Sequence, residues 1–318
     1  MLIISDSEVR ELLKMQDCID LLKTLFNDQL DPQTQLMVRQ RLPLPSGSLQ
    51  VMGGVVPYYR AAGLKTYISI PGSKSAQMVV VLFGTESAEP LAIISANALG
   101  QIRTGAVSGL ATDYMAKSDA KTVSVIGSGF QAFTQMEAVC KVRKINKAFV
   151  YSRNQKSREA FANRMSSYLD IDVSATKSSD EAVVSAEIIC TITNSADPVL
   201  NGTSINLGSH INAAGSNNST RRELDAFTIQ RSSVIVVDDI DQAKIEAGDL
   251  IGVQNQGVFK WEDILSLSEV VSQKSLGRSD NQEITLFESQ GIGTEDVITA
   301  MHVYHMALEN KIGEKVNL

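Results

Sequence analysis

The stretch VSVIGSGFQAFTQMEAV, residues 123–139, begins as a short apolar run, breaks at Gly127-Ser128-Gly129 and resumes with the spacing of a helix. A strand, a G-x-G-x-x-A pattern and a helix together indicate a dinucleotide-binding turn, with Ala132 as the third small residue. A side chain at either glycine would push a pyrophosphate away from the helix N-terminus, where the dipole favours an anion. The motif by itself is weak evidence, and the alternative is a tight strand-to-helix turn without a ligand.

Short β-rich runs alternate with helical stretches from about residue 121 to 240. The runs KTVSVIG, KAFVYS and IDVSAT are followed by helical stretches at 130–143, 157–169 and 179–186. EIICTIT, HINAAG and SSVIVVDD are typical of further buried strands. Because this alternation is the pattern of a parallel sheet with helices on both faces, we predict an α/β protein with a doubly wound, Rossmann-type sheet.

The chain before residue 120 has a different pattern. It begins with one amphipathic helix at about 6–27, continues with β-leaning runs near 36–44, 49–56, 64–70, 77–84 and 90–95, and ends in a helix at roughly 97–116. The tail from 294 to 316 is helical again, with apolar residues along one stripe. We therefore predict two domains: a dinucleotide-binding domain at 118–293, and a second, α+β domain made of 1–117 with 294–318.

Composition argues against several classes of function. A net charge of −7, a pI near 5.1 and the lack of a dense Lys/Arg stripe favour a small-molecule partner over nucleic acid or an anionic membrane. The N-terminus MLIISDSEVR lacks a signal-peptide pattern, and Glu86 and Glu89 interrupt the longest apolar stretch, so we expect a cytoplasmic protein. The cysteines are isolated, with no CxxC spacing, which indicates neither a disulfide framework nor a metal site.

The end of the second predicted Rossmann strand bears on the choice of cofactor. Many NAD binders carry an Asp or Glu about 20 residues beyond the glycines, but VYSRNQKS has Ser152, Arg153 and Asn154 there. No carboxylate would repel a 2′-phosphate, and Arg153 could pair with it, as could Lys156 or Arg158. We expect NADP as the preferred cofactor, with NAD possible; the alternative for Arg153 is a solvated residue at a strand end.

Five spaced motifs carry a resemblance over nearly the whole chain. They are GSGFQA, IRTGAVSGLAT at 102–112, GSHINAAGSNNSTRRELD at 208–225, VVDDIDQAKIEAGDL at 236–250 and LFESQGIGTEDVITA at 286–300. In this order they resemble the ornithine cyclodeaminase/μ-crystallin family. The resemblance implies a Rossmann domain joined to a substrate-binding and dimerisation domain whose sheet completes a barrel-like homodimer. Its members include cyclodeaminases for ornithine or lysine, amino-acid dehydrogenases such as those for alanine, and reductases of cyclic imino acids.

The resemblance also implies a set of substrate residues. Arg41 in RQRLPLP and Arg103 in IRTGA would hold a substrate carboxylate, with Thr104 beside them, and Lys65 in AGLKTYIS would stand next to the reacting nitrogen. Each cation has a plainer interpretation as a solvated charge, and Arg39 competes with Arg41. Lys65 lies in an apolar β-like run, where desolvation could lower its pKa toward the range of proton transfer. The residues implied at the cofactor are Gly127, Ser128, Gly129, Gln131, Ala132, Ser152, Arg153, Asn154, Thr191 and Ser289.

One departure from the family pattern favours a particular activity. The position of a catalytic Asp in the cyclodeaminases and alanine dehydrogenases aligns with Asn217, and an amide can orient a substrate but cannot take up a proton. Reduction of a preformed imine needs less acid/base chemistry than cyclodeamination. We therefore predict an NADPH-dependent reductase of pyrroline-2-carboxylate or piperideine-2-carboxylate, giving proline or pipecolate, with Lys65 and Asn217 at the catalytic centre. The alternatives are a cyclodeaminase, an amino-acid dehydrogenase, and a non-catalytic NADPH-binding protein.

Overall fold

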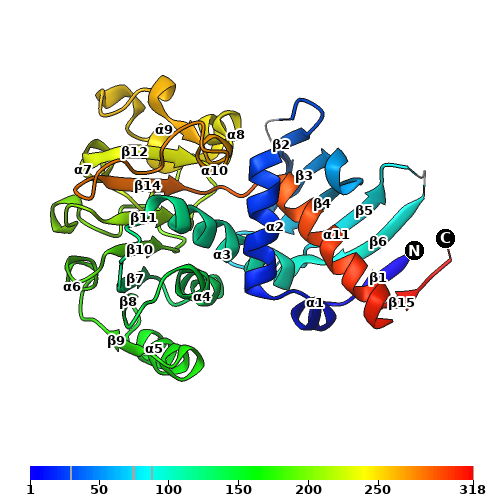
Figure 1. Ribbon diagram of the computed structural model, residues 1–318, viewed down its shortest axis with the longest axis horizontal. Coiled ribbons are helices and arrows are strands. Elements are labelled where there is room, and N and C mark those ends of the chain that lie inside the picture. The colour runs from blue at the N-terminus through cyan, green and yellow to red at the C-terminus, as the bar shows by residue number, and fades with distance from the viewer. Residues whose placement is uncertain (29–30, 74–75, 87–88, 318) are drawn as a thin grey trace. The chain divides into compact units, whose positions relative to one another are not determined.

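The structure, a computed structural model, describes residues 1–28, 31–73, 76–86 and 89–317, and the chain forms two compact units (Figure 1). Unit 1 comprises Met1–Arg103 and Gly291–Leu318, and unit 2 comprises Thr104–Gln290. The first boundary falls within one continuous helix, α3 (Ala96–Met115), whereas the boundaries expected from the sequence stand at 117/118 and 293/294. Each unit has its own sheet, and the predicted α/β fold is confirmed.

Unit 2 is built on an eight-stranded sheet in which every paired strand is parallel. The six strands predicted between 121 and 240 are present, and two more follow them in the chain. From one edge to the other the order is β13 (Leu265–Ser266), β12 (Ser232–Val237), β14 (Ile284–Glu288), β11 (His210–Ala213), β10 (Ile188–Thr191), β7 (Thr122–Ile126), β8 (Lys147–Tyr151) and β9 (Asp172–Ala175).

Alternate residues of each strand face opposite sides of this sheet, and both sides carry apolar side chains. Helices therefore cover both faces. Ile189 packs with Ile211 and Leu286 in one apolar cluster, whereas its neighbours Ile188 and Cys190 pack in another. The helices of unit 2, besides the end of α3, are α4 (Ala132–Val142), α5 (Gln155–Leu169), α6 (Ser179–Val184), α7 (Ala226–Arg231), α8 (Ile240–Glu246), α9 (Gly248–Ile251) and α10 (Leu267–Val271), with 3₁₀ turns at Gly202–Ser204, Gln254–Gln256 and Trp261–Asp263.

The strand order reverses at β7. The chain runs outward from β7 through β8 to β9 and then crosses back to β10 on the other side of β7. In doubly wound sheets the crevice at the carboxyl ends of the strands, at such a switch point, is the ligand site. Gly127 directly follows β7 and Ile192 directly follows β10, so the glycine turn lies at this edge.

Unit 1 has a mostly antiparallel sheet, in which the described residues form the order β15 (Glu314–Lys315), β1 (Leu2–Ile4), β6 (Pro90–Ser95), β5 (Val79–Gly84), β4 (Ala61–Ser69), β3 (Gly47–Val56) and β2 (Gln35–Leu44). A 3₁₀ turn, Pro57–Tyr59, joins β3 to β4. The single helix expected at 6–27 is two helices, α1 (Asp6–Leu12) and α2 (Met15–Asp28), because Leu13 is extended. The C-terminal helix α11 (Gly293–Asn310) is followed by the short strand β15 instead of continuing to 316.

The two faces of the unit 1 sheet differ in their covering. Register puts Met52, Lys65 and Val80 side by side on one face, where all three are buried. Helix α11 packs on this face and α2 packs on α11, as the blue and red helices of unit 1 show in Figure 1. The opposite face is apolar but open, since Leu42 and Ile68 are 55% and 49% exposed. Its half-buried members are Leu49, Val51, Val55, Leu64, Val79, Val81, Phe83 and Ile93.

Candidate functional site

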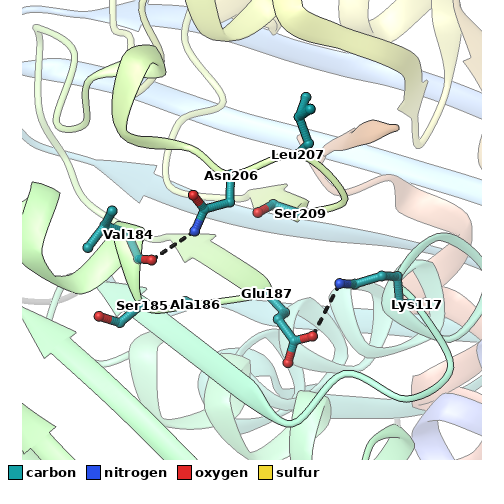
Figure 2. A pocket seen from close by; sticks show the side chains of 8 residues that line it. All are labelled: Lys117, Val184, Ser185, Ala186, Glu187, Asn206, Leu207 and Ser209. Atoms are coloured by element: carbon teal, nitrogen blue, oxygen red, sulfur yellow. Dashed lines mark hydrogen bonds and ion pairs between the residues drawn. The ribbon is translucent and has the colours of Figure 1, made fainter. Parts of the chain in front are cut away.

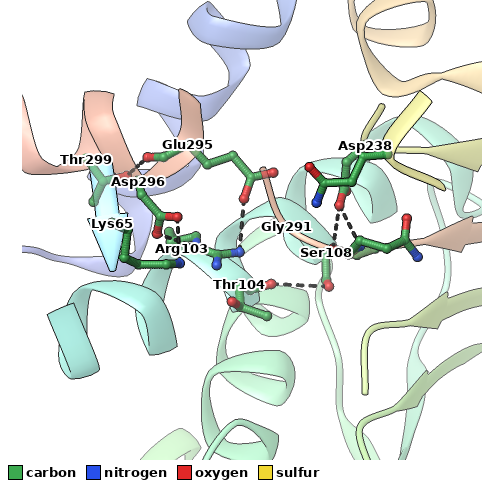
Figure 3. Close-up of polar contacts among 12 residues, drawn as sticks. Lys65, Arg103, Thr104, Ser108, Asp238, Gly291, Glu295, Asp296 and Thr299 are labelled. Atoms are coloured by element: carbon green, nitrogen blue, oxygen red, sulfur yellow. Dashed lines mark hydrogen bonds and ion pairs between the residues drawn. The ribbon is translucent and has the colours of Figure 1, made fainter. Parts of the chain in front are cut away.

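Lys65 lies in β4 on the covered face of the unit 1 sheet, with only 2% of its surface exposed. Its Nζ atom is 2.6 Å from Oδ2 of Asp296 in the first turn of α11 (Figure 3). Burial, followed by the nearby Arg103 cation, lowers the pKa of Lys65 to about 7, although Asp296 opposes the shift. A lysine with this pKa exchanges a proton readily at neutral pH, so the desolvation expected from the sequence is present and strong.

Arg103, in the third turn of α3, is held by two acidic residues of α11. Its Nε donates to Oδ1 of Asp296 at 3.0 Å, and its Nη1 donates to Oε2 of Glu295 at 3.0 Å. A Cβ on Gly291 would lie 2.3 Å from the Arg103 guanidinium, and Gly291 has a φ of +72°, so glycine is required there. The guanidinium is thus fixed next to Lys65 through their shared partner Asp296.

Arg39 and Arg41 both lie on the face of the sheet that carries Lys65. Arg39 is buried, and donates through Nη1 to the Tyr67 hydroxyl at 3.0 Å and through Nη2 to the Gly291 carbonyl at 3.1 Å. Arg41 pairs across the strands with Gln50, which in turn pairs with Tyr67 on β4, so it shares this face but is only half-buried. The structure therefore brings Arg39 close to Lys65 and Arg103, and places Arg41 farther out on the same face.

The buried charges of unit 1 do not balance. Among its described residues, the buried charged side chains are three cations and two carboxylates: Arg39, Lys65, Arg103, Glu295 and Asp296. Excess buried charge is costly unless a counter-charge arrives. This group of five residues, the Lys65 cluster, is therefore suited to a ligand that brings one carboxylate beside a group that can accept a proton.

The glycine turn of unit 2 fits a pyrophosphate. Gly127 has a φ of +126°, and a Cβ there would lie 2.5 Å from the Ile192 carbonyl, so the turn itself requires glycine. A Cβ on Gly129 would meet no described atom within 4 Å, so packing does not explain this second glycine. No side chain caps the N-terminus of α4, and buried Oε1 of Gln131 has no hydrogen-bond partner in the described residues. Open amide groups at a helix N-terminus beside a glycine are what a dinucleotide phosphate needs.

The end of β8 lies beside this turn. The Ser128 hydroxyl donates to the Ser152 hydroxyl at 2.8 Å, which joins the glycine turn to the place where the ribose acid is expected. Arg158 donates to the Ser152 carbonyl at 2.9 Å, and Asn154 caps α5 by accepting from the Ser157 amide. Arg153 is exposed. The structure thus gathers Ser128, Ser152 and an exposed arginine, with no carboxylate among these contacts.

The remaining expected residues are more dispersed. Thr104 follows Arg103 on α3 and is half-buried, and its carbonyl accepts from Gln135. Asn217 is exposed in the loop after β11. Ser289, after β14, is buried and donates to Asp238 at 3.2 Å. Thr191 is buried and donates to Glu223 at 2.9 Å, so its hydroxyl serves a neighbouring carboxylate.

Sequence reasoning did not single out the acidic residues of these sites. Glu295 and Asp296 stand in the quoted GIGTEDVITA motif, where two carboxylates in the first turn of a helix would have been a signal. In unit 2, burial raises the pKa of Glu223 to about 7 and that of Asp249 to about 6. Burial and these two neighbours raise the pKa of Glu288 well above its ordinary value. Only the fold brings these three together.

A small hollow of about 210 Å³ lies at the amino-terminal edge of the unit 2 sheet (Figure 2). Glu187 precedes β10 and Ser209 precedes β11, and the Lys117 ammonium is 3.2 Å from the Glu187 carboxylate. The glycine turn is at the carboxyl edge, so this hollow lies at the opposite edge of the sheet from the expected dinucleotide site. No described helix is long and apolar enough to cross a membrane, and no described group of three or more His, Cys, Asp or Glu has the arrangement of a metal site.

Comparisons with known proteins agree over the full length. The chain matches the model of the ornithine cyclodeaminase/mu-crystallin family over residues 1–311. A Delta(1)-pyrroline-2-carboxylate reductase of Bacillus cereus is 33% identical over 324 residues, which cover 99% of each chain. The Thermococcus litoralis Delta(1)-pyrroline-2-carboxylate reductase, solved with NADH and L-proline, has a TM-score of 0.96 at 34% identity and covers 99% of this chain and 100% of its own. An archaeal alanine dehydrogenase dimer with bound NAD has a TM-score of 0.94 at 30% identity and covers 100% of this chain and 99% of its own.

Proposed function

The chain belongs to the ornithine cyclodeaminase/mu-crystallin family, and on this premise we propose that it is an NADPH-dependent reductase of cyclic imino acids. Its substrates would be pyrroline-2-carboxylate or piperideine-2-carboxylate, and its products proline or pipecolate. Unit 1 would bind the imino acid and unit 2 the dinucleotide. The observation that carries the proposal is Lys65, buried, with a pKa of about 7, in a cluster that contains one more cation than carboxylate.

Reduction of a cyclic imino acid would require the Lys65 cluster to bind the substrate carboxylate and to supply a proton. The substrate carboxylate would pair with Arg103 and with Arg39 or Arg41, and the planar guanidinium is suited to two parallel hydrogen bonds. Lys65 would donate its proton to the ring nitrogen as the imine carbon becomes tetrahedral, and Asp296 would hold the ammonium in place and keep it charged. The nicotinamide cofactor supplies the hydride. In the reverse direction neutral Lys65 would take the proton back.

The proposed preference for NADPH rests on the end of β8. Ser152 and Arg153 stand where an acidic residue would select against a 2′-phosphate, and Arg153 is exposed and so accessible to one. The two related structures described above contain NADH and NAD. They support the use of a nicotinamide dinucleotide, whereas the preference for a cofactor with a 2′-phosphate is proposed for this chain from its own residues. Gly127, Gly129 and Gln131 would hold the pyrophosphate in either case.

We also propose a homodimer. The open face of the unit 1 sheet is apolar over several strands, and a monomer rarely leaves so extensive an apolar surface exposed. A second copy of the same chain is the natural cover, because a two-fold axis presents the same face twice. The alanine dehydrogenase relative was solved as a dimer. A cytoplasmic location, expected from the N-terminus, stays a prediction.

A cofactor-oxidation panel tests the function. NADPH and NADH would each be mixed with pyrroline-2-carboxylate, piperideine-2-carboxylate, and pyruvate with ammonia, while ornithine and lysine are tested for ammonia release. We expect the cyclic imines with NADPH to give the highest kcat/KM. Faster oxidation with pyruvate and ammonia would instead indicate an amino-acid dehydrogenase, and ammonia release from ornithine at a comparable rate would indicate a cyclodeaminase. Cofactor binding without turnover on any substrate would refute the enzymatic proposal.

A further inference from the structure

We propose that Glu223 is a positioning residue for the nicotinamide half of the cofactor. Its carboxylate joins the loop after β10 to the loop after β11 at the carboxyl edge of the unit 2 sheet. The inference rests on the proposed use of a nicotinamide dinucleotide, but not on the identity of the imino acid.

The position of these loops follows from the switch point. If the pyrophosphate lies at the glycine turn after β7 and the adenine ribose at Ser152 after β8, the other half of the dinucleotide extends to the opposite side of β7. The strands on that side are β10 and then β11. The segment after β10 also packs against the glycine turn, since the Ile192 carbonyl leaves no room for a Cβ on Gly127. A displacement of this segment would therefore change the position of the turn and weaken cofactor binding.

Glu223 accepts four hydrogen bonds from the last residue of β10 and from these two loops. One carboxylate oxygen accepts from the Thr193 amide at 2.6 Å and from the Thr193 hydroxyl at 2.7 Å. The other accepts from the Thr191 hydroxyl at 2.9 Å and from the Gly215 amide at 2.8 Å. A carboxylate is the side chain that offers enough lone pairs for four donors converging from two segments. Glu223 and Thr191 are fully buried, so their polar groups would be costly to leave unpaired.

Two further contacts show that the geometry is fixed. The backbone amides of Glu223 and Leu224 both donate to Oδ1 of Asp249, at 2.7 and 2.6 Å, so the carboxylate is presented from an anchored backbone. A Cβ on Gly215 would lie 2.4 Å from the Thr193 amide nitrogen and 2.5 Å from Oε2 of Glu223. The two loops and Glu223 thus pack without space for a methyl group. Asn217, the expected catalytic amide, is two residues beyond Gly215 in the same loop.

Two variants of the full-length protein test the proposal. Glu223→Gln keeps the shape but replaces one acceptor by a donor, so at least one backbone amide loses its partner. Gly215→Ala leaves the carboxylate intact and displaces the same loops. We expect each variant to raise the Kd for NADPH, measured by quenching of protein or cofactor fluorescence, by about tenfold or more. The KM for the cofactor should rise with it, and kcat should fall, whereas the KM for the imino acid should change little. Asp225→Asn is the matched control, because Asp225 is the half-buried N-cap of α7 in unit 2 and accepts from the Gly202 and Thr228 amides instead of from these loops.

The outcomes separate this inference from the proposed function. If the unmodified protein binds NADPH but reduces no imino acid, a weakened Kd in both variants still supports the role of Glu223, and only the substrate is wrong. Folded Glu223→Gln and Gly215→Ala proteins that bind NADPH as tightly as the unmodified protein would overturn the inference. An equal loss of cofactor affinity in Asp225→Asn would also overturn it, because the effect would then reflect general destabilisation of unit 2. If Glu223→Gln does not fold, the result for Gly215→Ala decides.

Discussion

Replacing Asp296 by asparagine should move the pH dependence of imine reduction toward acid. In the proposed mechanism reduction needs protonated Lys65, and its pKa of about 7 predicts that kcat/KM is high below pH 7 and falls about tenfold per pH unit above it. Asp296 holds the proton on Lys65 through a contact of 2.6 Å. The asparagine oxygen can still accept a hydrogen bond from Lys65 or Arg103, but it carries no charge.

The size of the effect follows from the distance. At 2.6 Å two unit charges attract by roughly 6 kcal/mol at an effective dielectric constant of about 20. The asparagine amide can replace part of this attraction by its own hydrogen bond, so we take roughly 2–3 kcal/mol as the net loss of stabilisation of protonated Lys65. This loss lowers the pKa of Lys65 by about two pH units and moves the decline of kcat/KM to lower pH by the same amount. The deficit of Asp296→Asn in kcat/KM should therefore be about 50-fold at pH 7 and only about twofold at pH 5.

The assay is steady-state NADPH oxidation with the cyclic imine from pH 5 to 9, expressed as the ratio of variant to unmodified protein. Ionisation of the imine itself cancels in this ratio. Glu295→Gln is the matched control: it also removes a buried negative charge beside Arg103, but Glu295 makes its ion pair with Arg103 and not with Lys65. We expect its ratio to be flat with pH. A flat ratio for Asp296→Asn would contradict the role of Lys65 as the proton donor.

Four further outcomes are expected. Ser152→Asp should reverse the order of affinity between NADPH and NADH, by about 1–3 kcal/mol in titrations of both cofactors, and equal affinities in the unmodified protein would contradict the basis for this. Arg103→Lys, which keeps the charge but loses the planar fork, should raise the KM for the imino acid by roughly tenfold and leave the Kd for NADPH nearly unchanged; the reverse pattern would assign Arg103 to the cofactor. Asn217→Asp restores a carboxylate and should bring measurable amino-acid oxidation while imine reduction continues; no gain in oxidation would show that Asn217 does not discriminate between the activities. Burial lowers the pKa of His210 to about 3, so the folded protein keeps this side chain neutral, and its contribution to the free energy of unfolding is present above the unfolded pKa of about 6.5 and is lost as the pH falls. The loss should be about 2 kcal/mol at pH 5. Denaturant titrations at pH 7 and pH 5 should detect this difference, and it should be absent in His210→Gln.

Much of unit 2 follows from local pattern. The strands β7 to β12 were predictable because alternation, apolar runs and helix starts are properties of a few consecutive residues. The glycine turn at Gly127 and Gly129 could be predicted for the same reason, because the need for glycine in such a turn is set by a few consecutive residues. Ser178 caps α6 in the same local way, because its hydroxyl accepts a hydrogen bond from the Glu181 amide three residues later, at 3.1 Å. Leu13, by contrast, interrupts a continuous amphipathic pattern that gave no sign of a break.

The electrostatics of the site came only from the tertiary structure. The apolar neighbours of Lys65 indicated desolvation, but not that Asp296, from the other end of the chain, would lie 2.6 Å away and hold the proton. The sequence does not show whether Arg39 or Arg41 is the buried arginine. The strand register, a bulge in β2 and the helix that covers the sheet together determine that it is Arg39. Glu223 resembles any other glutamate until β10 and β11 present their loops to it. Backbone preference is a local quantity and can be read along the chain, whereas a pKa or an ion pair depends on burial and on charges brought together by the fold.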